Sequence, residues 1–405
     1  MHSPGLRIAA LAITVAALFA CSDPPTEPER KTVPALAATP FATELLSPQW
    51  QERARGLVRA NAVGPIPAGR VFAALSVAQY RAVVAADAQL SAEQPRGGNG
   101  FGAGGRAGYE ALRGAVSGAS VAVLSFLFPA DAATLETQVT SDANANVGDI
   151  HPSFTRGLAI GRSVGAAMVS HLQSDGSALA WTGTLPVGPQ YFTGTPVGAN
   201  LAAVTPYLIN STSQFRVSSH PVFNSPEFLA ALNEVLTISQ NRTAQQIAIA
   251  LKWARAGSGS TPLGYWNELA ANYIVEAGLS EREATRVFAL THAAQFDAQL
   301  TCFESKYFYS LLRPNQANTA VTIVSGITQP SYPAYPSGHA CISSSAAHVL
   351  KHFFPAHSGE LTDLVLEASE SRLIAGIHYR FDMDASRVMG VAVANWAIAH
   401  EDGLL

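Results

Sequence analysis

The sequence predicts an all-α protein of two packed helical bundles with long loops. Alanine- and leucine-rich patterns recur at the three- and four-residue spacing of helices over most of the 405 residues. The alternating pattern of strands is scarce. Hydrophobic residues make up 48% of the chain and charged residues 13%, about half the usual share near 25%. Such a chain can bury a large core.

The charge pattern argues against a nucleic-acid partner. The formal net charge is −4, and no basic run is present, whereas binding to a phosphate backbone requires clustered cations. Lysine occurs at only four positions. Each charge that falls in an apolar segment therefore needs a specific partner.

The N-terminal residues have the pattern of an export signal. Arg7 precedes the largely apolar run 8–20, which is short for a membrane span. The sequence Leu-Phe-Ala-Cys ending at Cys21 resembles a bacterial lipobox, and an ordinary cleaved signal is the alternative. We expect a signal peptide over 1–20 and a tether over 21–46. The protein would be periplasmic or at the cell surface, at the outer membrane, and held to the membrane only through lipid on Cys21.

The remaining chain forms two predicted halves that meet at residue 225. The N-terminal half covers 47–225 and ends in a long Gly-, Pro-, Ser- and Thr-rich loop over 176–221. Its predicted helices cover 51–94, 108–128, 130–143 and 154–173.

The C-terminal half covers 226–405 and is expected to carry the functional site. Start signals at Ser225-Pro226 and Ser280-Glu281 mark two of its helices. A second long loop is expected over 315–336. The predicted helices cover 226–236, 243–256, 264–277, 281–312, 339–354, 359–375 and 385–400.

Two cations lie near the end of the longest of these helices. Lys306 and Arg313 are seven residues apart, which places both on one face of a continuous helix. Like charges on one face repel each other, so this pair favours a bound anion. Two solvated surface cations are the simpler explanation when the motif is taken alone.

A third and a fourth anion-binding element follow at the next predicted helix start. Ser337 offers a hydroxyl, and Gly338 offers a backbone N–H at the positive end of a helix dipole. His339 would then lie beside the anion as a proton donor. An ordinary serine N-cap with a glycine turn is the structural alternative.

The last motif adds another cation and a paired histidine. Arg372 is followed by His378 and, four residues later, by Asp382. On a helix this spacing would let the carboxylate hold the ring tautomer and leave the other ring nitrogen free to bind or attack. A solvated i,i+4 pair is the alternative.

These segments together match eleven specified positions of one signature, in order. The chain resembles the superfamily that unites vanadium-dependent haloperoxidases with type 2 phosphatidic acid phosphatases and bacterial acid phosphatases. The resemblance to soluble bacterial haloperoxidase-like members extends over about 45–400. It implies a haloperoxidase/acid phosphatase-like fold. The oxyanion-binding residues that it implies are Lys306, Arg313, Ser337, Gly338 and Arg372.

The resemblance also implies the catalytic residues. His339 would be the acid–base group. His378 would be the axial ligand of vanadium, or the nucleophile that accepts a phosphoryl group. Asp382 and Asp297 would support these side chains from behind, and Phe303 and Tyr332 are candidates for the halide pocket.

Both activities fit one site because five-coordinate vanadate has the shape of the phosphoryl-transfer transition state. The Arg380-Phe381 pair before Asp382 is more typical of the haloperoxidase branch, and phosphatases more often have Pro-Ser there. Phe303 and Tyr332 differ from the residues common in haloperoxidases. We predict a haloperoxidase-like enzyme that uses vanadate-bound peroxide to oxidise halide to a hypohalous-acid-like species, with hydrogen peroxide and halide as substrates.

Two other functions stay open. One is a soluble periplasmic acid phosphatase that acts on a phosphate ester through a phosphohistidine and needs no cofactor. The other is a non-catalytic surface lipoprotein that binds an oxyanion, against which the complete residue set argues. A homodimer is expected only by analogy. Cys302 and Cys341 could pair in an oxidising compartment, although single buried thiols are more common in a protein of this size.

Overall fold

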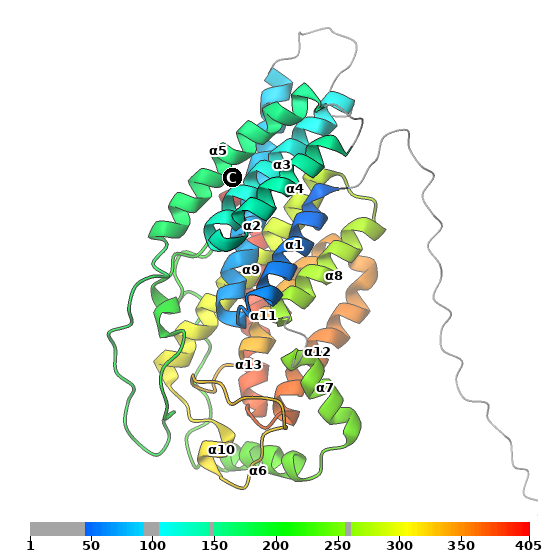
Figure 1. Cartoon of the computed structure of the whole chain (residues 1–405). Coiled ribbons are helices and arrows are strands. Elements are labelled where there is room, and N and C mark those ends of the chain that lie inside the picture. The colour runs from blue at the N-terminus through cyan, green and yellow to red at the C-terminus, as the bar shows by residue number, and fades with distance from the viewer. Residues whose placement is uncertain (1–44, 93–104, 146–149, 256–260) are drawn as a thin grey trace, which may run out of the picture. The chain divides into compact units, whose positions relative to one another are not determined.

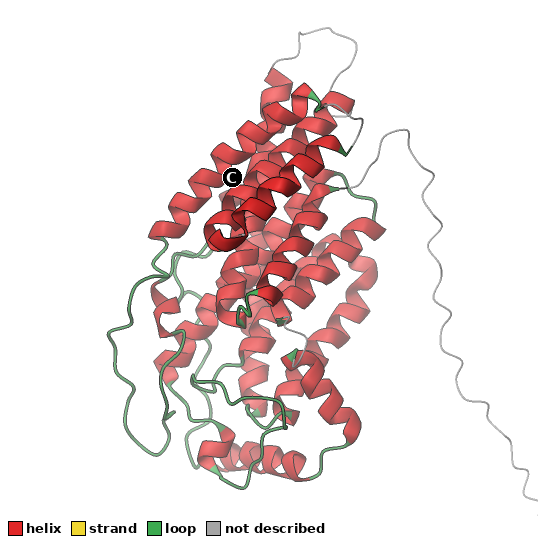
Figure 2. Cartoon of the chain, in the orientation of Figure 1, coloured by secondary structure: helices red, strands yellow, loops and turns green. Residues whose placement is uncertain are grey.

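Helices provide nearly all the regular structure of the protein. The computed structural model describes residues 45–92, 105–145, 150–255 and 261–405 (Figure 1). These residues form thirteen α-helices and four short 3-10 helices and contain no strand (Figure 2). The all-α prediction is confirmed. The predicted signal peptide, Cys21 and all but the last two residues of the predicted tether lie outside the described residues.

The first half of the described chain contributes five α-helices. The single helix predicted over 51–94 is wrong, because two helices separated by residues 61–64 occupy this stretch. Ala62 has a positive φ of 48° there, and the residue before Pro65 is disfavoured in helical conformation. The five helices are α1 (Leu46–Ala60), α2 (Pro65–Ala92), α3 (Arg106–Leu127), α4 (Ala132–Asn144) and α5 (Pro152–Ser174).

The second half contributes the remaining eight. The predicted starts are confirmed, since the Ser225 side chain accepts from the Phe228 N–H and Ser280 forms a capping box with Glu283. The helices are α6 (Pro226–Gln240), α7 (Ala244–Ala254), α8 (Pro262–Glu276), α9 (Glu281–Tyr309), α10 (Pro314–Ala317), α11 (Gly338–Phe353), α12 (Ser358–Ile374) and α13 (Arg380–Ala399).

Helix α9 forms the centre of the packing. Most of its residues are buried, and it packs against α2 from the first half and against α11 and α13 from the second (Figure 1). The described residues all fall in one compact unit. Helices from both sides of residue 225 therefore share one interior.

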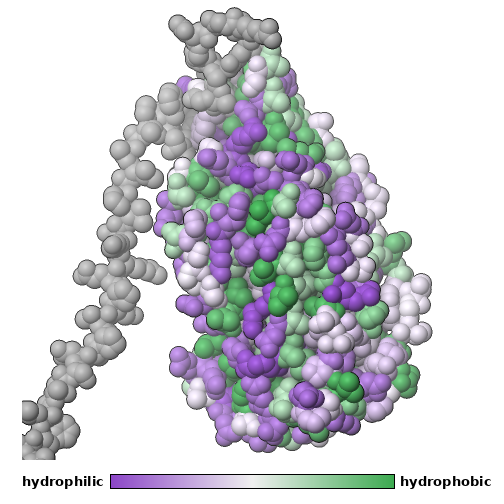
Figure 3. Space-filling view, turned by 180° about the vertical axis from the view of Figure 1, so that it is seen from behind, coloured by the Kyte–Doolittle hydropathy of each residue, from purple (hydrophilic) through white to green (hydrophobic). Residues whose placement is uncertain are grey.

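Two helices, α2 and α3, are long and apolar enough to cross a membrane. Their most apolar stretches are 67% and 78% buried inside the protein, so the helical core accounts for their hydropathy. On the face shown in Figure 3, hydrophilic and apolar residues are interspersed. The high hydrophobic share and low charged share of the sequence thus reflect a large protein interior with few charges.

The long loop after α5 is fastened to α9 by a buried carboxylate. Both oxygens of Asp297 accept backbone N–H groups from the loop, at 2.8 Å from Tyr207, 2.8 Å from Leu208 and 3.0 Å from Ile209. Burial raises the pKa of Asp297 to about 6. These contacts hold the loop, whereas the sequence analysis had placed Asp297 behind the oxyanion-binding side chains.

Helices α3 and α5 approach each other so closely that glycine is required between them. A Cβ atom on Gly157 would lie 1.9 Å from the carbonyl oxygen of Ala111, and one on Gly161 would lie 2.2 Å from that of Ala115. Real Cβ atoms do not come this close to backbone atoms. The two helix backbones would have to move apart to admit any side chain.

Gly157→Ala is therefore expected to lower the free energy of unfolding by about 1–3 kcal/mol, the usual cost of overpacking. Gly359→Ala is the matched control, because Gly359 is also helical but has open space at its Cβ position. That control should be neutral or stabilise by up to about 1 kcal/mol through helix propensity. Urea unfolding of both variants measures the difference, and equal midpoints would contradict the close-packing argument.

Candidate active site

Residues from five segments converge on one buried cluster, which we call the oxyanion cluster. The segments are the end of α9, the chain before α10, the start of α11, the end of α12 and the start of α13. Its side chains are at most 3% exposed. The members described below are Lys306, Arg313, Ser337, Arg372, His378 and Asp382, with Gly338 and His339 adjoining.

Lys306 and Arg313 lie together in this cluster, but they are not on one helix as predicted. Helix α9 ends at Tyr309, and Ser310 follows with a positive φ of 51°. The prediction that both cations lie on one face of one helix is therefore wrong. Both instead face the ring of Tyr332, with Lys306 Nζ 5.2 Å and Arg313 Cζ 5.1 Å from its centroid.

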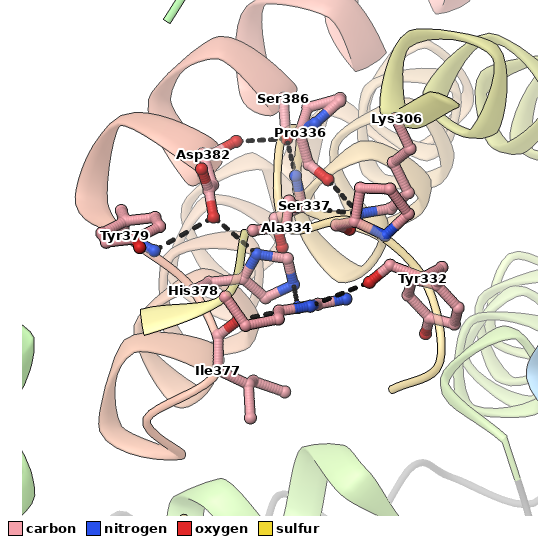
Figure 4. Close-up of polar contacts among 12 residues, drawn as sticks. Lys306, Tyr332, Ala334, Pro336, Ser337, Ile377, His378, Tyr379, Asp382 and Ser386 are labelled. Atoms are coloured by element: carbon pink, nitrogen blue, oxygen red, sulfur yellow. Dashed lines mark hydrogen bonds and ion pairs between the residues drawn. The ribbon is translucent and has the colours of Figure 1, made fainter. Parts of the chain in front are cut away.

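The Lys306 ammonium group is held by backbone carbonyl oxygens of the proline-rich loop. Nζ donates to Pro333 at 2.9 Å, to Ala334 at 2.8 Å and to Pro336 (Figure 4). Burial lowers the pKa of Lys306 to about 8. The lysine is thus a fixed, charged group at neutral pH that loses its charge under mildly alkaline conditions.

Arg313 has one nitrogen without a partner. Its Nε donates to the Tyr332 carbonyl at 3.0 Å, and its Nη1 donates to the Ile377 carbonyl at 2.7 Å and to His378 Nε2 at 3.0 Å. Nη2 is buried, and no described group accepts from it. Buried charged donors are rarely left unpaired, so Nη2 is suited to an anionic ligand.

Ser337 also has a buried polar atom without a partner among the described residues. Its backbone N–H donates to Ser386 Oγ at 2.7 Å and to the Asp382 carbonyl at 3.2 Å. Its hydroxyl is fully buried, accepts no capping hydrogen bond and has no partner among the described residues. Beside it, no described atom outside the local backbone lies within 4 Å of a Cβ position on Gly338. The serine therefore occupies the N-cap position without acting as a cap.

Asp382 determines which nitrogen of His378 is free. His378 precedes α13, so only Asp382 is helical, and its carboxylate reaches back from the first turn. Oδ2 accepts from His378 Nδ1 at 2.8 Å and from the Tyr379 N–H at 3.0 Å (Figure 4). Nε2 therefore carries the lone pair that faces Arg313.

Burial and the neighbouring cations keep His378 neutral. Burial is the largest cause, and the charges of Arg313 and Lys306 add to it, so the pKa of His378 lies well below its usual value. Burial also raises the pKa of Asp382 to about 7, although Lys306 and Arg313 oppose this shift. A neutral imidazole with a lone pair on Nε2 is the form that binds a metal or attacks phosphorus.

Helix α7 holds the two remaining polar side chains by its backbone. Trp253 O accepts from His339 Nε2 at 3.0 Å, and Ala250 O accepts from Arg372 Nη2 at 2.7 Å. A carbonyl can only accept, so the His339 proton is on Nε2 and its Nδ1 is free. Burial and then the charge of Arg372 lower the pKa of His339 well below its usual value.

Phe303 and Tyr332 lie next to His339, as expected of pocket candidates. Their rings meet edge to face with centroids 5.1 Å apart. Both line a narrow pocket of ≈ 30 Å³ together with Gly338, His339 and Cys302. The acid–base candidate therefore borders a pocket large enough for a water molecule.

Some contributors were missed by sequence reasoning. Ser386 lies four residues after Asp382 and holds the Ser337 N–H, and this helical spacing is the one signal that could have identified it. Arg242 donates to the Ile374 carbonyl at 2.6 Å and to Thr322 Oγ1 at 2.9 Å, which joins the end of α12 to the second long loop. The carbonyl groups of α7 had no signal, because every residue carries one.

Comparison with known proteins finds a family match over the part of the chain that carries the oxyanion cluster. Residues 287–402 match the family model of the PAP2 superfamily. The chain is 36% identical over 66 residues to a non-specific acid phosphatase from Providencia stuartii and 40% identical over 57 residues to one from Salmonella typhi. These matches cover 16% and 14% of this chain and only 25% and 23% of the phosphatases, so the chain matches about a quarter of their length.

The similarity to solved structures covers most of the chain. A bacterial vanadium-dependent iodoperoxidase superposes with a TM-score of 0.71 at 21% identity, over 90% of this chain and 97% of that one. A bacterial vanadium-dependent chloroperoxidase superposes with a TM-score of 0.64 at 16% identity, over 84% and 93%. At these identities the likeness concerns the fold.

The predicted resemblance is thereby confirmed. The chain carries the PAP2 superfamily segment, which includes the whole oxyanion cluster, within the all-helical fold of vanadium-dependent haloperoxidases. Its named relatives and structural neighbours are acid phosphatases and haloperoxidases.

The variant Ser337→Ala distinguishes two possible roles of the Ser337 hydroxyl, which are binding a ligand and capping a helix. Because the hydroxyl has no partner, its loss should change the free energy of unfolding by less than about 0.5 kcal/mol, whereas losing a cap costs about 1 kcal/mol. Oxyanion affinity should fall roughly tenfold, the value of one hydrogen bond to a charged group. Calorimetric titration with phosphate and thermal unfolding measure the two effects. The control, Ser386→Ala, should cost about 1–3 kcal/mol of stability, and a stability loss at Ser337 without an affinity loss would contradict the assignment.

The pKa of Lys306 predicts how anion binding depends on pH. Lys306 is protonated below about pH 8 and loses its charge above it, so anion affinity should decline as pH rises beyond about 8. Sulfate is the best probe because its own charge is constant over this range. In Lys306→Met affinity should be lower by roughly tenfold or more, and the alkaline decline should disappear. Lys351→Met, outside the cluster, should keep both, and an unchanged decline in Lys306→Met would assign the titration to another group.

Proposed function

We propose that the chain is a vanadium-dependent haloperoxidase, with vanadate as its cofactor and hydrogen peroxide and a halide ion as its substrates. The observation that carries this proposal is a buried site with three cations, unpartnered donors on Arg313 and Ser337, and a neutral His378 lone pair. This set matches the needs of vanadate, which has several anionic oxygens and accepts a nitrogen ligand.

Some residues of this chain would neutralise the charge of the bound oxyanion, and others would fix its position. Lys306, Arg313 and Arg372 would offset the negative charge of the oxyanion, and because they are held in place by carbonyl groups, little reorganisation is needed on binding. Ser337 Oγ and the Gly338 N–H would donate to the remaining oxygens. His378 Nε2 would supply a nitrogen ligand, and Asp382 would orient the ring through Nδ1.

His339 would transfer protons through its free Nδ1, since its Nε2 proton is engaged by Trp253 O. The narrow pocket beside it would admit peroxide and halide, and Phe303 and Tyr332 would exclude bulk water there. Vanadate, when bound, would supply a Lewis-acidic centre that activates hydrogen peroxide toward halide without a change in the oxidation state of vanadium.

A soluble acid phosphatase is the second candidate function. The identities of 36% and 40% to acid phosphatases favour it, although they concern short segments. In this reaction His378 Nε2 would attack phosphorus, and His339 would protonate the leaving oxygen. The fold shared over 97% of an iodoperoxidase and the Arg380-Phe381 pair favour the haloperoxidase. Arg380 pairs with Glu234 and Glu370, which holds the start of α13 against α6 and α12.

We also propose that the protein is an exported lipoprotein attached through Cys21. The basic residue, apolar run and lipobox-like cysteine support this localisation. Metabolic labelling with a fatty acid, compared between the wild type and Cys21→Ser, tests it.

Purified protein assayed with hydrogen peroxide and bromide or iodide, with and without vanadate, separates the two activities. Halogenation that requires vanadate supports the first, and release of phosphate from an aryl phosphate by the vanadate-free protein, inhibited by vanadate, supports the second. If neither activity nor oxyanion binding is detected, both proposals fail.

Variants of the two histidines test their separate roles. His378→Ala should abolish vanadate retention, because it removes the nitrogen ligand. His339→Ala should retain vanadate but lose turnover by roughly 10²–10⁴-fold, the usual contribution of a general acid–base group. His348→Ala, on the outer part of α11, is the control and should behave as wild type. A fully active His339→Ala variant would contradict its assigned role.

A further inference from the structure

Two cysteines lie beside the oxyanion cluster and take no part in the proposed reaction. Cys302 on α9 and Cys341 on α11 are both fully buried, belong to one apolar cluster and are not bonded to each other. Each thiol shifts the pKa of the other, so the two side chains are neighbours where α9 packs against α11. Two neighbouring thiols on different helices are placed for oxidation to a disulfide.

Each cysteine is close to a residue of the site. Cys302 lies one helical turn before Lys306, and its Sγ is 3.9 Å from Pro336 O, which also accepts from Lys306. Cys341 lies two residues after His339, and its backbone N–H donates to the Ser337 carbonyl. A covalent link between them would join the two helices that carry these residues.

One of the two thiols can be reached by a small oxidant. Cys302 lines the narrow pocket that also contains His339. Pro65, which is exposed, lines the same pocket, so the pocket lies close to the protein surface. Its volume of ≈ 30 Å³ exceeds the roughly 10–15 Å³ that a water molecule needs. Cys341 is absent from the lining of this pocket.

The electrostatic surroundings also make the pair unequal. Burial opposes ionisation of Cys302, but the Cys341 thiol and the charge of Lys306 lower its pKa overall. Burial and the neighbouring Cys302 raise the pKa of Cys341. The thiolate is the nucleophile, and because Cys302 also lines the pocket, it is the thiol that an oxidant reaches first.

We propose that Cys302 and Cys341 form a peroxide-sensitive dithiol, which hydrogen peroxide converts to a disulfide that links α9 to α11 beside the active site. The proposal depends on the proposed function only for the natural source of peroxide, which would be a substrate there.

The reaction proceeds in two balanced steps. Cys302 sulfur attacks one peroxide oxygen, an S–O bond forms, the O–O bond breaks, and the leaving hydroxide takes the thiol proton to become water. Cys341 sulfur then attacks the Cys302 sulfenic acid, an S–S bond forms, the S–O bond breaks, and a second water leaves with the Cys341 proton. One peroxide is reduced and two thiols are oxidised.

The disulfide would protect the site from irreversible damage. A lone Cys302 sulfenic acid can be oxidised further to sulfinic acid, which thiol reductants do not reverse. Attack by Cys341 ends the sequence at a disulfide, which dithiothreitol reduces. The second cysteine thus makes oxidation at the pocket reversible.

The test uses the reduced full-length chain treated with hydrogen peroxide and then digested with trypsin. Cys302 lies in the peptide 287–306 and Cys341 in the peptide 307–351, so mass spectrometry detects the link as a joined peptide that lacks two hydrogens. We expect near-complete linkage in the wild type and full recovery of both thiols with dithiothreitol.

Two single variants distinguish the roles of the cysteines. Cys341→Ser should form no link, and its Cys302 should become sulfinic acid that dithiothreitol does not recover. Cys302→Ser should leave Cys341 reduced at the same peroxide dose. The proposal is overturned if the wild type accumulates sulfinic acid without a link, or if both thiols stay reduced at doses that oxidise the urea-unfolded chain.

The His378→Ala variant separates this proposal from the proposed function. It is expected to be inactive, yet it should form the disulfide as the wild type does, because the oxidant is added directly. Absence of haloperoxidase activity therefore leaves the dithiol proposal standing, and absence of the link leaves the proposed function standing.

Discussion

The burial of three like charges at one point is the constraint on which the rest of this structure depends. Lys306, Arg313 and Arg372 repel one another and each loses hydration, which would be costly for isolated ions in a protein interior. Backbone carbonyl oxygens from the proline-rich loop, from the chain before α13 and from α7 offset part of this cost. These carbonyl groups leave the oxyanion cluster with a net positive charge, which a bound oxyanion would neutralise. Without such an anion, the remaining repulsion between the cations lowers the stability of the fold.

The helices and loops are arranged so that backbone carbonyl groups surround the three buried cations. Helix α9 carries Lys306 into the middle of the protein, and the loops on either side of α10 and α11 bring carbonyl groups to it. Asp297 fastens the first long loop to the same helix through three backbone N–H groups. Close glycine packing between α3 and α5 makes the first half compact.

The same electrostatics decide the protonation states on which either chemistry depends. Burial, with positive neighbours adding to it, keeps His378 and His339 neutral. Asp382 and Trp253 O select opposite nitrogens of the two rings as proton carriers. His378 therefore presents Nε2 to the ligand and His339 retains Nδ1. A site of this kind accepts a tetrahedral or a five-coordinate oxyanion, and this shared geometry is why vanadate oxidation and phosphoryl transfer both remain compatible with it.

The sequence by itself determined the all-α class and the residues of the oxyanion cluster, because helical periodicity and the spacing of a signature are local properties of the chain. It failed where the backbone changes direction: Lys306 and Arg313 were placed on one helix that in fact ends at Tyr309, and Asp297 was placed behind the site that it does not touch. Only the tertiary structure decided which donors stay unpaired, which ring nitrogens are free, and that Cys302 lies against Cys341. Those properties depend on backbone carbonyl groups and on burial. Both are supplied by segments distant in the sequence, so the identity of a residue does not reveal them.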